Sequence, residues 1–173
     1  MSTLGRVKCA VLGSRGLVAQ RLLQRLSNHH WLAPVCVVGS SESEGMKVSE
    51  IPWSFGEIKP SLPELRIIGI GQNGELASHL ISEGVRIVFS ALPDSPASYI
   101  EEELAKAGLV VISHSTVHRH SQVIPLVVPG VNNDHLGLID LQSGFGKGML
   151  VSCPNCMVVP LGISIAPLIR SFP

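Results

Sequence analysis

The chain has 173 residues, 45% of them hydrophobic and 15% charged, and its 13 basic residues balance 13 acidic ones. This composition excludes a disordered chain and a fibrous protein. The balanced charge argues against a nucleic-acid partner and against an anionic membrane surface, because both require an excess of Lys and Arg. A single compact domain covering residues 1–173 is therefore predicted, with a core large enough to need no disulfide or metal.

Two apolar stretches bear on compartment and partners. Residues 9–12 form a run that is too short for a signal peptide, so we expect a cytoplasmic protein whose four cysteines are thiols. The uncharged stretch 148–169 is long enough to cross a membrane, but three prolines interrupt it. We expect no membrane contact there. The low share of charged residues instead predicts a homo-oligomer that covers apolar surface.

Short β-branched runs alternate with amphipathic segments along the chain, a pattern typical of βαβ units. Strands are predicted at 6–12, 33–38, 65–70, 85–90, 109–113, 125–128 and 148–153. Helices are predicted at 16–28, 74–83 and 95–107, and from about Cys156 to Arg170. In the third helix Ser95 is the expected N-cap, Pro96 the first helical residue and Gly108 the C-terminal stop. The predicted fold class is α/β, Rossmann-like and doubly wound, with a mostly parallel sheet and helices on both faces.

A glycine-rich turn follows the first predicted strand and opens a helix. Its pattern is G-x-x-G-x-x-A, and its residues are Gly13, Ser14, Arg15, Gly16, Leu17, Val18 and Ala19. The first glycine permits the tight turn, the second lets the backbone approach a pyrophosphate, and the alanine allows close helix–strand packing. We therefore predict a dinucleotide site here, although an ordinary strand–helix turn would also need glycine.

The loop after the second strand carries the next candidate contacts with a cofactor. It contains Ser40 and Glu42 and no basic residue. A carboxylate can accept from a ribose hydroxyl and would repel a 2′-phosphate, so we expect NAD rather than NADP. A solvated acidic loop with no cofactor is the alternative. The end of the fourth strand reaches the same edge of a doubly wound sheet and joins the predicted cofactor site with Ser90, Ala91, Leu92 and Pro93.

A cysteine lies where the last strand gives way to the last helix. Cys156 would face the positive end of the helix dipole, which favours its thiolate and makes it the candidate nucleophile. Asn155 beside it could donate its amide to an oxyanion. Two buried structural cysteines, Cys153 and Cys156, are the alternative reading.

Several segments together resemble the N-terminal part of the aspartate-β-semialdehyde dehydrogenase family over nearly the whole chain. They are Val11–Val18, Val88–Pro93, Leu104–Gly108, Val110–Ser113, His118-Arg119, Pro125–Pro129, Val131-Asn132 and Pro154–Cys156. In that family a cysteine attacks the aldehyde, hydride passes to NADP, and phosphate cleaves the acyl-enzyme. The resemblance implies that Cys156 is the nucleophile, that Arg119 binds phosphate, and that Gly13 and Gly16 form the cofactor turn.

The chain also departs from the family's pattern. His114 and Cys153 replace asparagines, Gly130 replaces a glutamate, and the apolar Met157 follows the nucleophile. Glu42 stands where an arginine for the 2′-phosphate is expected. We expect the family's second domain to be absent, and with it the general acid/base that hydride transfer requires. Loss of such a group costs on the order of 10² to 10⁴ in rate.

These departures leave several functions open. We favour a non-redox conversion of a small carbonyl compound, such as cyclisation, aldol reaction, isomerisation or hydrolysis, carried out by Cys156, Asn155, His114 and Arg119. A semialdehyde dehydrogenase completed by a partner or oligomer is one alternative, and a non-catalytic nucleotide- or partner-binding module is another.

The remaining motifs suggest two further possibilities. A metal site at His114, His118 and His120 has tolerable ligand spacing, but solvated loop histidines are the more common case, so we predict no metal. The Cys153-x-x-Cys156 spacing is compatible with a reversible disulfide that would silence the nucleophile.

Overall fold

The computed structural model describes residues 5–56, 59, 61–62, 64–71 and 75–172. The chain forms two compact units, Met1–Leu92 and Pro93–Pro173, each described by itself below.

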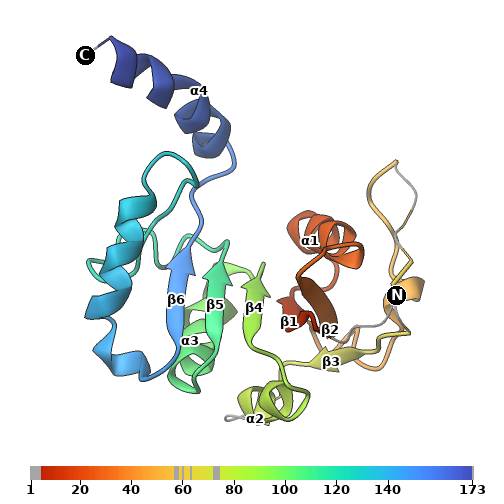
Figure 1. Ribbon diagram of the computed structural model, residues 1–173. Coiled ribbons are helices and arrows are strands. Elements are labelled where there is room, and N and C mark those ends of the chain that lie inside the picture. The colour runs from red at the N-terminus through yellow and green to blue at the C-terminus, as the bar shows by residue number, and fades with distance from the viewer. Residues whose placement is uncertain (1–4, 57–58, 60, 63, 72–74, 173) are drawn as a thin grey trace. The chain divides into compact units, whose positions relative to one another are not determined.

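The first unit is built on four parallel strands in the order β3-β2-β1-β4 (Figure 1). The strands are β1 (Val7–Leu12), β2 (Leu32–Gly39), β3 (Ile67–Gly69) and β4 (Ile87–Ser90). The helices are α1 (Leu17–Ser27), α2 (Glu75–Ser82) and the short 3₁₀ helix η1 (Val48–Glu50). This strand order is the first part of the order that is typical of dinucleotide-binding domains.

The core of the first unit lies between α1 and the strands. Ala19, Leu23 and Leu26 recur at helical spacing on one face of α1 and are buried against Val11 and Val37. Burying such side chains contributes about 1.5–3 kcal/mol each for the larger ones. Because α1 is anchored along this face, the turn that precedes it is held at the carboxyl end of β1.

The second unit contains two parallel strands and two α-helices. Its elements are α3 (Asp94–Lys106), β5 (Val110–Ser113), the 3₁₀ helices η2 (Asn133–Leu141) and η3 (Ser143–Phe145), β6 (Met149–Ser152) and α4 (Val158–Ser171). The strands pair in register from Val110–Met149 to Ser113–Ser152. Gly148 lets β6 begin close to α3, since a Cβ at this position would collide with the carbonyl oxygen of Ala105.

Helix α4 differs from α1, α2 and α3 in having no buried residue. Figure 1 shows it following the carboxyl end of β6 at the end of the chain. Its exposed apolar side chains are Val158, Leu161, Ile163, Ile165, Leu168 and Ile169. None of the described helices is long and apolar enough to cross a membrane.

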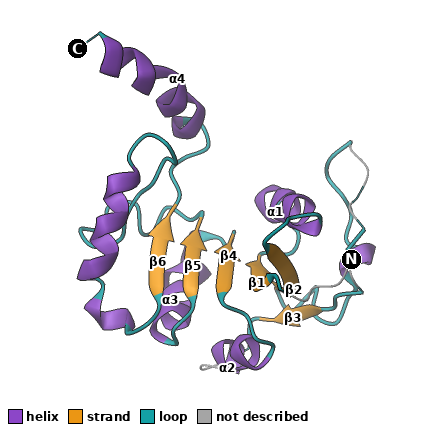
Figure 2. Ribbon diagram, in the orientation of Figure 1, coloured by secondary structure: helices purple, strands orange, loops and turns teal. Residues whose placement is uncertain are grey.

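The parallel strands and their helical connections confirm the Rossmann-like α/β class. Two local predictions were wrong. The segment 125–128 is not a strand: Leu126 makes an isolated bridge with Ser152, and the chain between β5 and β6 otherwise consists of loops and short helices (Figure 2). Ser95 does not cap α3, because the helix already starts at Asp94, whose carboxylate accepts a hydrogen bond from the Thr116 backbone at 2.9 Å.

Candidate functional site

Two glycines shape the turn between β1 and α1, and they do so differently. Gly13 has φ +98°, and a Cβ there would lie 2.7 Å from the carbonyl oxygen of Ala91. Gly16 has an ordinary φ of −67°, and a Cβ there would meet no atom of the described residues within 4 Å. The fold therefore requires glycine at position 13. At position 16 it leaves open space, where the sequence predicts the approach of a pyrophosphate.

The start of α1 is suited to an anion. Gly16 is its N-cap, and in the part of the chain that the structure describes the helix start has no side-chain capping hydrogen bond. Leu17 and Val18 are exposed, while Ala19 is fully buried against the sheet as predicted. Uncapped amides at a helix start attract phosphate groups because they are unpaired donors at the positive end of the helix dipole.

The loop after β2 is fastened to this turn by two serines. Ser14 and Ser43 place their hydroxyl oxygens 3.2 Å apart, and the Ser43 hydroxyl donates to the Ser40 carbonyl at 3.1 Å. Gly39 makes room for both, because a Cβ there would collide with the two hydroxyls. Sequence reasoning included Ser14 and Ser40 but missed Ser43, which is fully buried. Its only sequence signal was the glycine at the strand end.

Glu42 forms an exposed ion pair that links the loop to the turn. Its carboxylate lies 3.4 Å from the Arg15 guanidinium. The Glu42 side chain is 80% exposed and the Arg15 side chain is 51% exposed. Arg15 was counted with the glycine turn and Glu42 with the ribose loop, so the structure brings these two predicted contacts together. The pair offsets part of the negative charge that Glu42 would present to a cofactor.

The carboxyl end of β4 lies next to the same turn. Ser90 pairs with Leu12 in the β1–β4 register, and the Ala91 amide donates to the Leu12 carbonyl at 2.8 Å. The Ser90 hydroxyl is buried and has no hydrogen-bond partner among the described residues. Leu92 is buried, and Pro93 is the N-cap of α3 in the second unit.

These observations fit a dinucleotide. The open space at Gly16 and the uncapped helix start are features that a bound phosphate would use.

In the second unit His114 and Cys153 lie side by side because of strand register. Ser113 of β5 pairs with Ser152 of β6, so the residues that follow leave the sheet at the same edge. The Cys153 sulfur lies 4.0 Å from Nε2 of His114. Burial raises the pKa of the Cys153 thiol and lowers the pKa of the His114 imidazole. The resting pair at neutral pH is therefore a thiol and a neutral imidazole.

Arg119 fixes this pair through the backbone. Its Nε donates to the Cys153 carbonyl and one of its terminal nitrogens donates to the His114 carbonyl, both at 3.1 Å. Arg119 was predicted to bind phosphate on the strength of the resemblance. In the structure its guanidinium joins the ends of β5 and β6.

Asn155 and Cys156 lie in the short turn that precedes α4. Cys156 is exposed, and its sulfur is 3.8 Å from Oδ1 of Asn155. The same oxygen accepts a hydrogen bond from the Met157 backbone at 2.9 Å. Since both contacts use Oδ1, a hydrogen bond from Asn155 to a substrate oxygen would have to come from its Nδ2 amide group.

A buried pair beneath the 114–121 loop was missed by the sequence analysis. His118 Nε2 and Glu101 Oε2 are 3.0 Å apart, and both side chains are almost completely buried. The two atoms are close without the alignment of a hydrogen bond, because Nε2 has no hydrogen-bond partner among the described residues. The Ser115 hydroxyl contacts the same carboxylate oxygen at 3.4 Å. A glutamate inside a helical pattern gave no sign that it would face inward.

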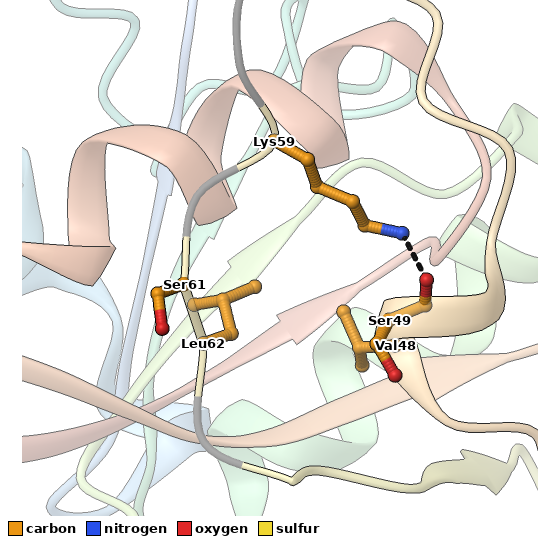
Figure 3. Close-up of a pocket in the computed structure, with 5 residues that line it drawn as sticks. All are labelled: Val48, Ser49, Lys59, Ser61 and Leu62. Carbon is orange, nitrogen blue, oxygen red and sulfur yellow. Dashed lines mark hydrogen bonds between the residues drawn. The ribbon is translucent and has the colours of Figure 1, made fainter.

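Two shallow hollows lie away from these residues. The first, in the first unit, has a volume of about 210 Å³ and is lined by Val48, Ser49, Lys59, Ser61 and Leu62 (Figure 3). The Lys59 ammonium donates to the Ser49 and Ile51 carbonyls, both at 2.7 Å, and burial lowers its pKa. The second lies between α4 and residues 129–131. None of the predicted site residues lines either hollow.

The alternative of a metal site at the histidines of the 114–121 loop has no support in the described residues. Within the described ranges, no group of three or more His, Cys, Asp or Glu side chains could hold a metal ion.

A comparison with protein families decides what these elements belong to. The sequence model described as the NAD binding domain of semialdehyde dehydrogenase matches residues 8–139. The chain belongs to this family. It is 33% identical to aspartate-semialdehyde dehydrogenase from Archaeoglobus fulgidus over 168 aligned residues. This alignment covers 94% of this chain and 46% of the relative. It is 31% identical to malonyl CoA reductase (NADP) from Metallosphaera sedula over 179 aligned residues. This alignment covers 96% of this chain and 45% of the relative.

A solved structure agrees with this family membership. Aspartate semialdehyde dehydrogenase with NADP from Candida albicans matches with a TM-score of 0.78 and 28% identity, over 96% of this chain and 48% of that one. The semialdehyde dehydrogenase relatives are thus about twice as long as this chain, which spans their NAD-binding part.

Proposed function

We propose that this chain is the dinucleotide-binding and nucleophile-bearing part of a semialdehyde-dehydrogenase-type enzyme, and that it binds NAD or NADP at the turn between β1 and α1. The observation that carries this proposal is the contrast between Gly13 and Gly16. Only Gly13 is required by packing and backbone conformation, and the space at Gly16 is open at an uncapped helix start. A glycine that the fold does not need suggests that a ligand needs it.

The residues proposed to hold the cofactor lie in the first unit. The amides of the turn would bind the pyrophosphate, and Ser40 and Glu42 would face the ribose. A bound nicotinamide would supply the acceptor or donor of hydride. The Glu42 carboxylate favours a free 2′-hydroxyl, so we propose NAD over NADP, although the reductase from Metallosphaera sedula and the solved dehydrogenase from Candida albicans are both named with NADP.

Titration of the whole chain with NAD and NADP by calorimetry tests this proposal. The informative variant is Gly16→Val, because the side chain has room in the protein and would obstruct a pyrophosphate. An open N-cap position tolerates this change at a cost of about 1 kcal/mol. Gly137→Ala is the matched control, since a Cβ there also meets nothing within 4 Å. We expect binding to the parent chain and to the control and none to Gly16→Val. Equal binding by all three would refute the assigned site.

Cys156 is the proposed nucleophile toward an aldehyde or thioester carbonyl. Its sulfur is exposed, and Asn155 is next to it to donate to the developing oxyanion. The family relatives named above act as an aldehyde dehydrogenase and an acyl-CoA reductase, according to their names. Both names are consistent with an acyl group carried on a cysteine.

A non-redox conversion of a carbonyl compound was the function favoured by the sequence. That reaction would use His114 as acid/base for Cys156, whereas the contact that the structure gives His114 is with Cys153. We therefore place hydride transfer ahead of it, in an assembly where a second polypeptide segment supplies the acid/base. Measuring NAD reduction with aspartate semialdehyde and phosphate, with Cys156→Ala as the inactive control, separates the two reactions.

A further inference from the structure

The two cysteines that follow β6 suggest a second reaction, different from the proposed hydride transfer. Cys153 and Cys156 are separated by two residues, a spacing at which thiol pairs form disulfides in oxidoreductases. Both are free thiols in the structure. Their surroundings differ, since Cys156 is exposed, whereas Cys153 is half-buried beside an imidazole.

We propose that Cys156, Cys153 and His114 form a thiol–disulfide exchange site whose substrate is a low-molecular-weight disulfide. The exposed Cys156 is the entry thiol, and Cys153 is the resolving thiol. His114 is the group that accepts the proton of Cys153 when its sulfur reacts.

The geometry supports this division of roles. A disulfide arriving from solvent meets the Cys156 sulfur first, because Cys153 is partly covered by the loop that carries His114 and Arg119. Cys153 has its own base, with 4.0 Å between its sulfur and Nε2 of His114. Burial raises the pKa of this thiol, so that a nearby proton acceptor is what would make it reactive at neutral pH.

One charge beside the pair favours each transient ion, while burial opposes both ions. Burial is the largest effect: it raises the pKa of Cys153 and lowers the pKa of His114. The Arg119 guanidinium lowers the pKa of both groups, which stabilises the Cys153 thiolate, and the Glu101 carboxylate raises the pKa of both groups, which stabilises the His114 imidazolium. Arg119 also holds the backbone carbonyls of His114 and Cys153, so the two side chains start from fixed positions.

The exchange proceeds in two balanced steps. The Cys156 thiol gives its proton to solvent, and its thiolate attacks one sulfur of the disulfide, forms a mixed disulfide and expels one small thiolate, which takes up a proton from solvent. Cys153 then gives its proton to Nε2 of His114, and its sulfur attacks the Cys156 sulfur. The second small thiol leaves with the proton from the imidazolium. Two protein thiols are oxidised to one disulfide, and one small disulfide is reduced to two thiols.

Oxidised glutathione is the probe that tests this site. The whole chain is incubated at pH 7.5, quenched with acid at intervals and analysed by intact mass and peptide mapping. We expect a transient glutathione adduct on Cys156, followed by a Cys153–Cys156 disulfide without adduct. The buried Cys9 and Cys36 serve as internal controls that stay reduced. A stable adduct on Cys156, or no adduct at all, would overturn the proposal.

Two variants assign the roles of the resolving thiol and the base. Cys153→Ser is expected to retain the Cys156 adduct. His114→Asn is expected to form it at the parent rate and to lose it on the order of 10² times more slowly, the lower end of general-base contributions. The exposed His120→Asn is the matched control, and His114→Gln serves if the first variant does not fold. Unchanged resolution in the folded His114 variant would eliminate the histidine. Because the readout is mass rather than turnover, the result is independent of cofactor binding.

Discussion

Arg119 donates to the backbone carbonyl of Cys153 at 3.1 Å, and through a second nitrogen to that of His114. The side chain thereby joins the ends of two neighbouring strands at the edge where the candidate nucleophile follows. Two such hydrogen bonds from one side chain, here called the Arg119 fork, are suited to arginine, because lysine has no comparable planar set of donors.

Removing this fork should destabilise the protein. Arg119→Ala leaves two part-buried carbonyls without their charged donor, and we expect the free energy of unfolding to fall by about 2 kcal/mol. Urea denaturation measures this loss. Arg170→Ala is the control, since Arg170 also binds two carbonyls but at an exposed place, where water can replace it at a cost below about 1 kcal/mol. Similar losses in both variants would contradict a structural role specific to Arg119.

Glu42 should set the preference between the two cofactors. Glu42→Gln removes one exposed negative charge near the proposed ribose site, and we expect NADP to bind about fivefold more tightly relative to NAD. Because the carboxylate is exposed, the effect should shrink at high salt. Calorimetry with both cofactors checks this ratio. Glu44→Gln makes the same charge change in the same loop and should leave the ratio unaltered; a shift of equal size there would point to general electrostatics.

Gly13 and Gly45, two of the glycines with positive φ in the first unit, should differ in how well they tolerate a side chain. Gly45 has φ +78° and open space at its Cβ position, so Gly45→Ala should cost about 1 kcal/mol from backbone strain alone. Gly13→Ala adds a contact of 2.7 Å with the Ala91 carbonyl and should cost about 3 kcal/mol. Denaturation curves of the two variants give the comparison directly. Equal costs would mean that the turn can move away from β4.

The buried thiols of β1 and β2 should make the protein sensitive to alkali. Burial raises the pKa of Cys9 to about 12 and that of Cys36 to about 11. Since the unfolded thiols ionise near 8.5, the unfolded state loses these protons first. Stability contributed by the thiols is therefore complete below about pH 8.5 and declines above it, by at most about 1.4 kcal/mol per pH unit for each thiol.

Urea denaturation at pH 7, 9 and 10 measures this decline. Cys36→Ala should have a shallower slope than the parent chain between pH 9 and 10. Cys156→Ala, which removes an exposed thiol, should keep the parent slope. Parallel curves for all three proteins would show that the buried thiols do not control the alkaline transition.

The apolar surface of α4 should support association of two copies of this chain. Leu168 and Ile169 are 59% and 63% exposed, and neighbouring turns of the helix expose further apolar side chains. A contiguous surface of this kind is typical of an interface. We expect a dimer in light scattering and a monomer for Leu168→Glu. Leu141→Glu places the same charge on an equally exposed leucine outside α4 and should stay dimeric. A monomeric parent chain would contradict the expectation.

Local patterns predicted most of the fold. The strand ending at Leu12, the helix with Leu23 and Leu26 on one face, and Gly108 with φ +95° after α3 are all found where periodicity and turn chemistry indicate. These features depend on neighbours in the sequence, which is why they could be predicted. The glycine turn belongs to the same class, because its spacing alone indicates a tight strand-to-helix connection.

The two wrong local predictions, and the contact that was missed, depend on interactions between residues far apart in the sequence. The run 125–128 has strand composition, but β6 ends at Ser152 and offers it one bridging residue. Asp94 begins α3 because Thr116, 22 residues later, binds its carboxylate. The His114–Cys153 contact likewise follows from the register of β5 and β6. No local pattern contains such register information.

The candidate residues are divided between the two compact units, with the glycine turn before Leu92 and the candidate cysteines Cys153 and Cys156 after Pro93. The proposed nucleotide binding and the proposed thiol chemistry would thus be encoded in separate stretches of the gene. Mutational drift can erase one and spare the other, so a descendant of this chain could evolve into a nucleotide sensor without thiol reactivity, or into a thiol protein that ignores nucleotides.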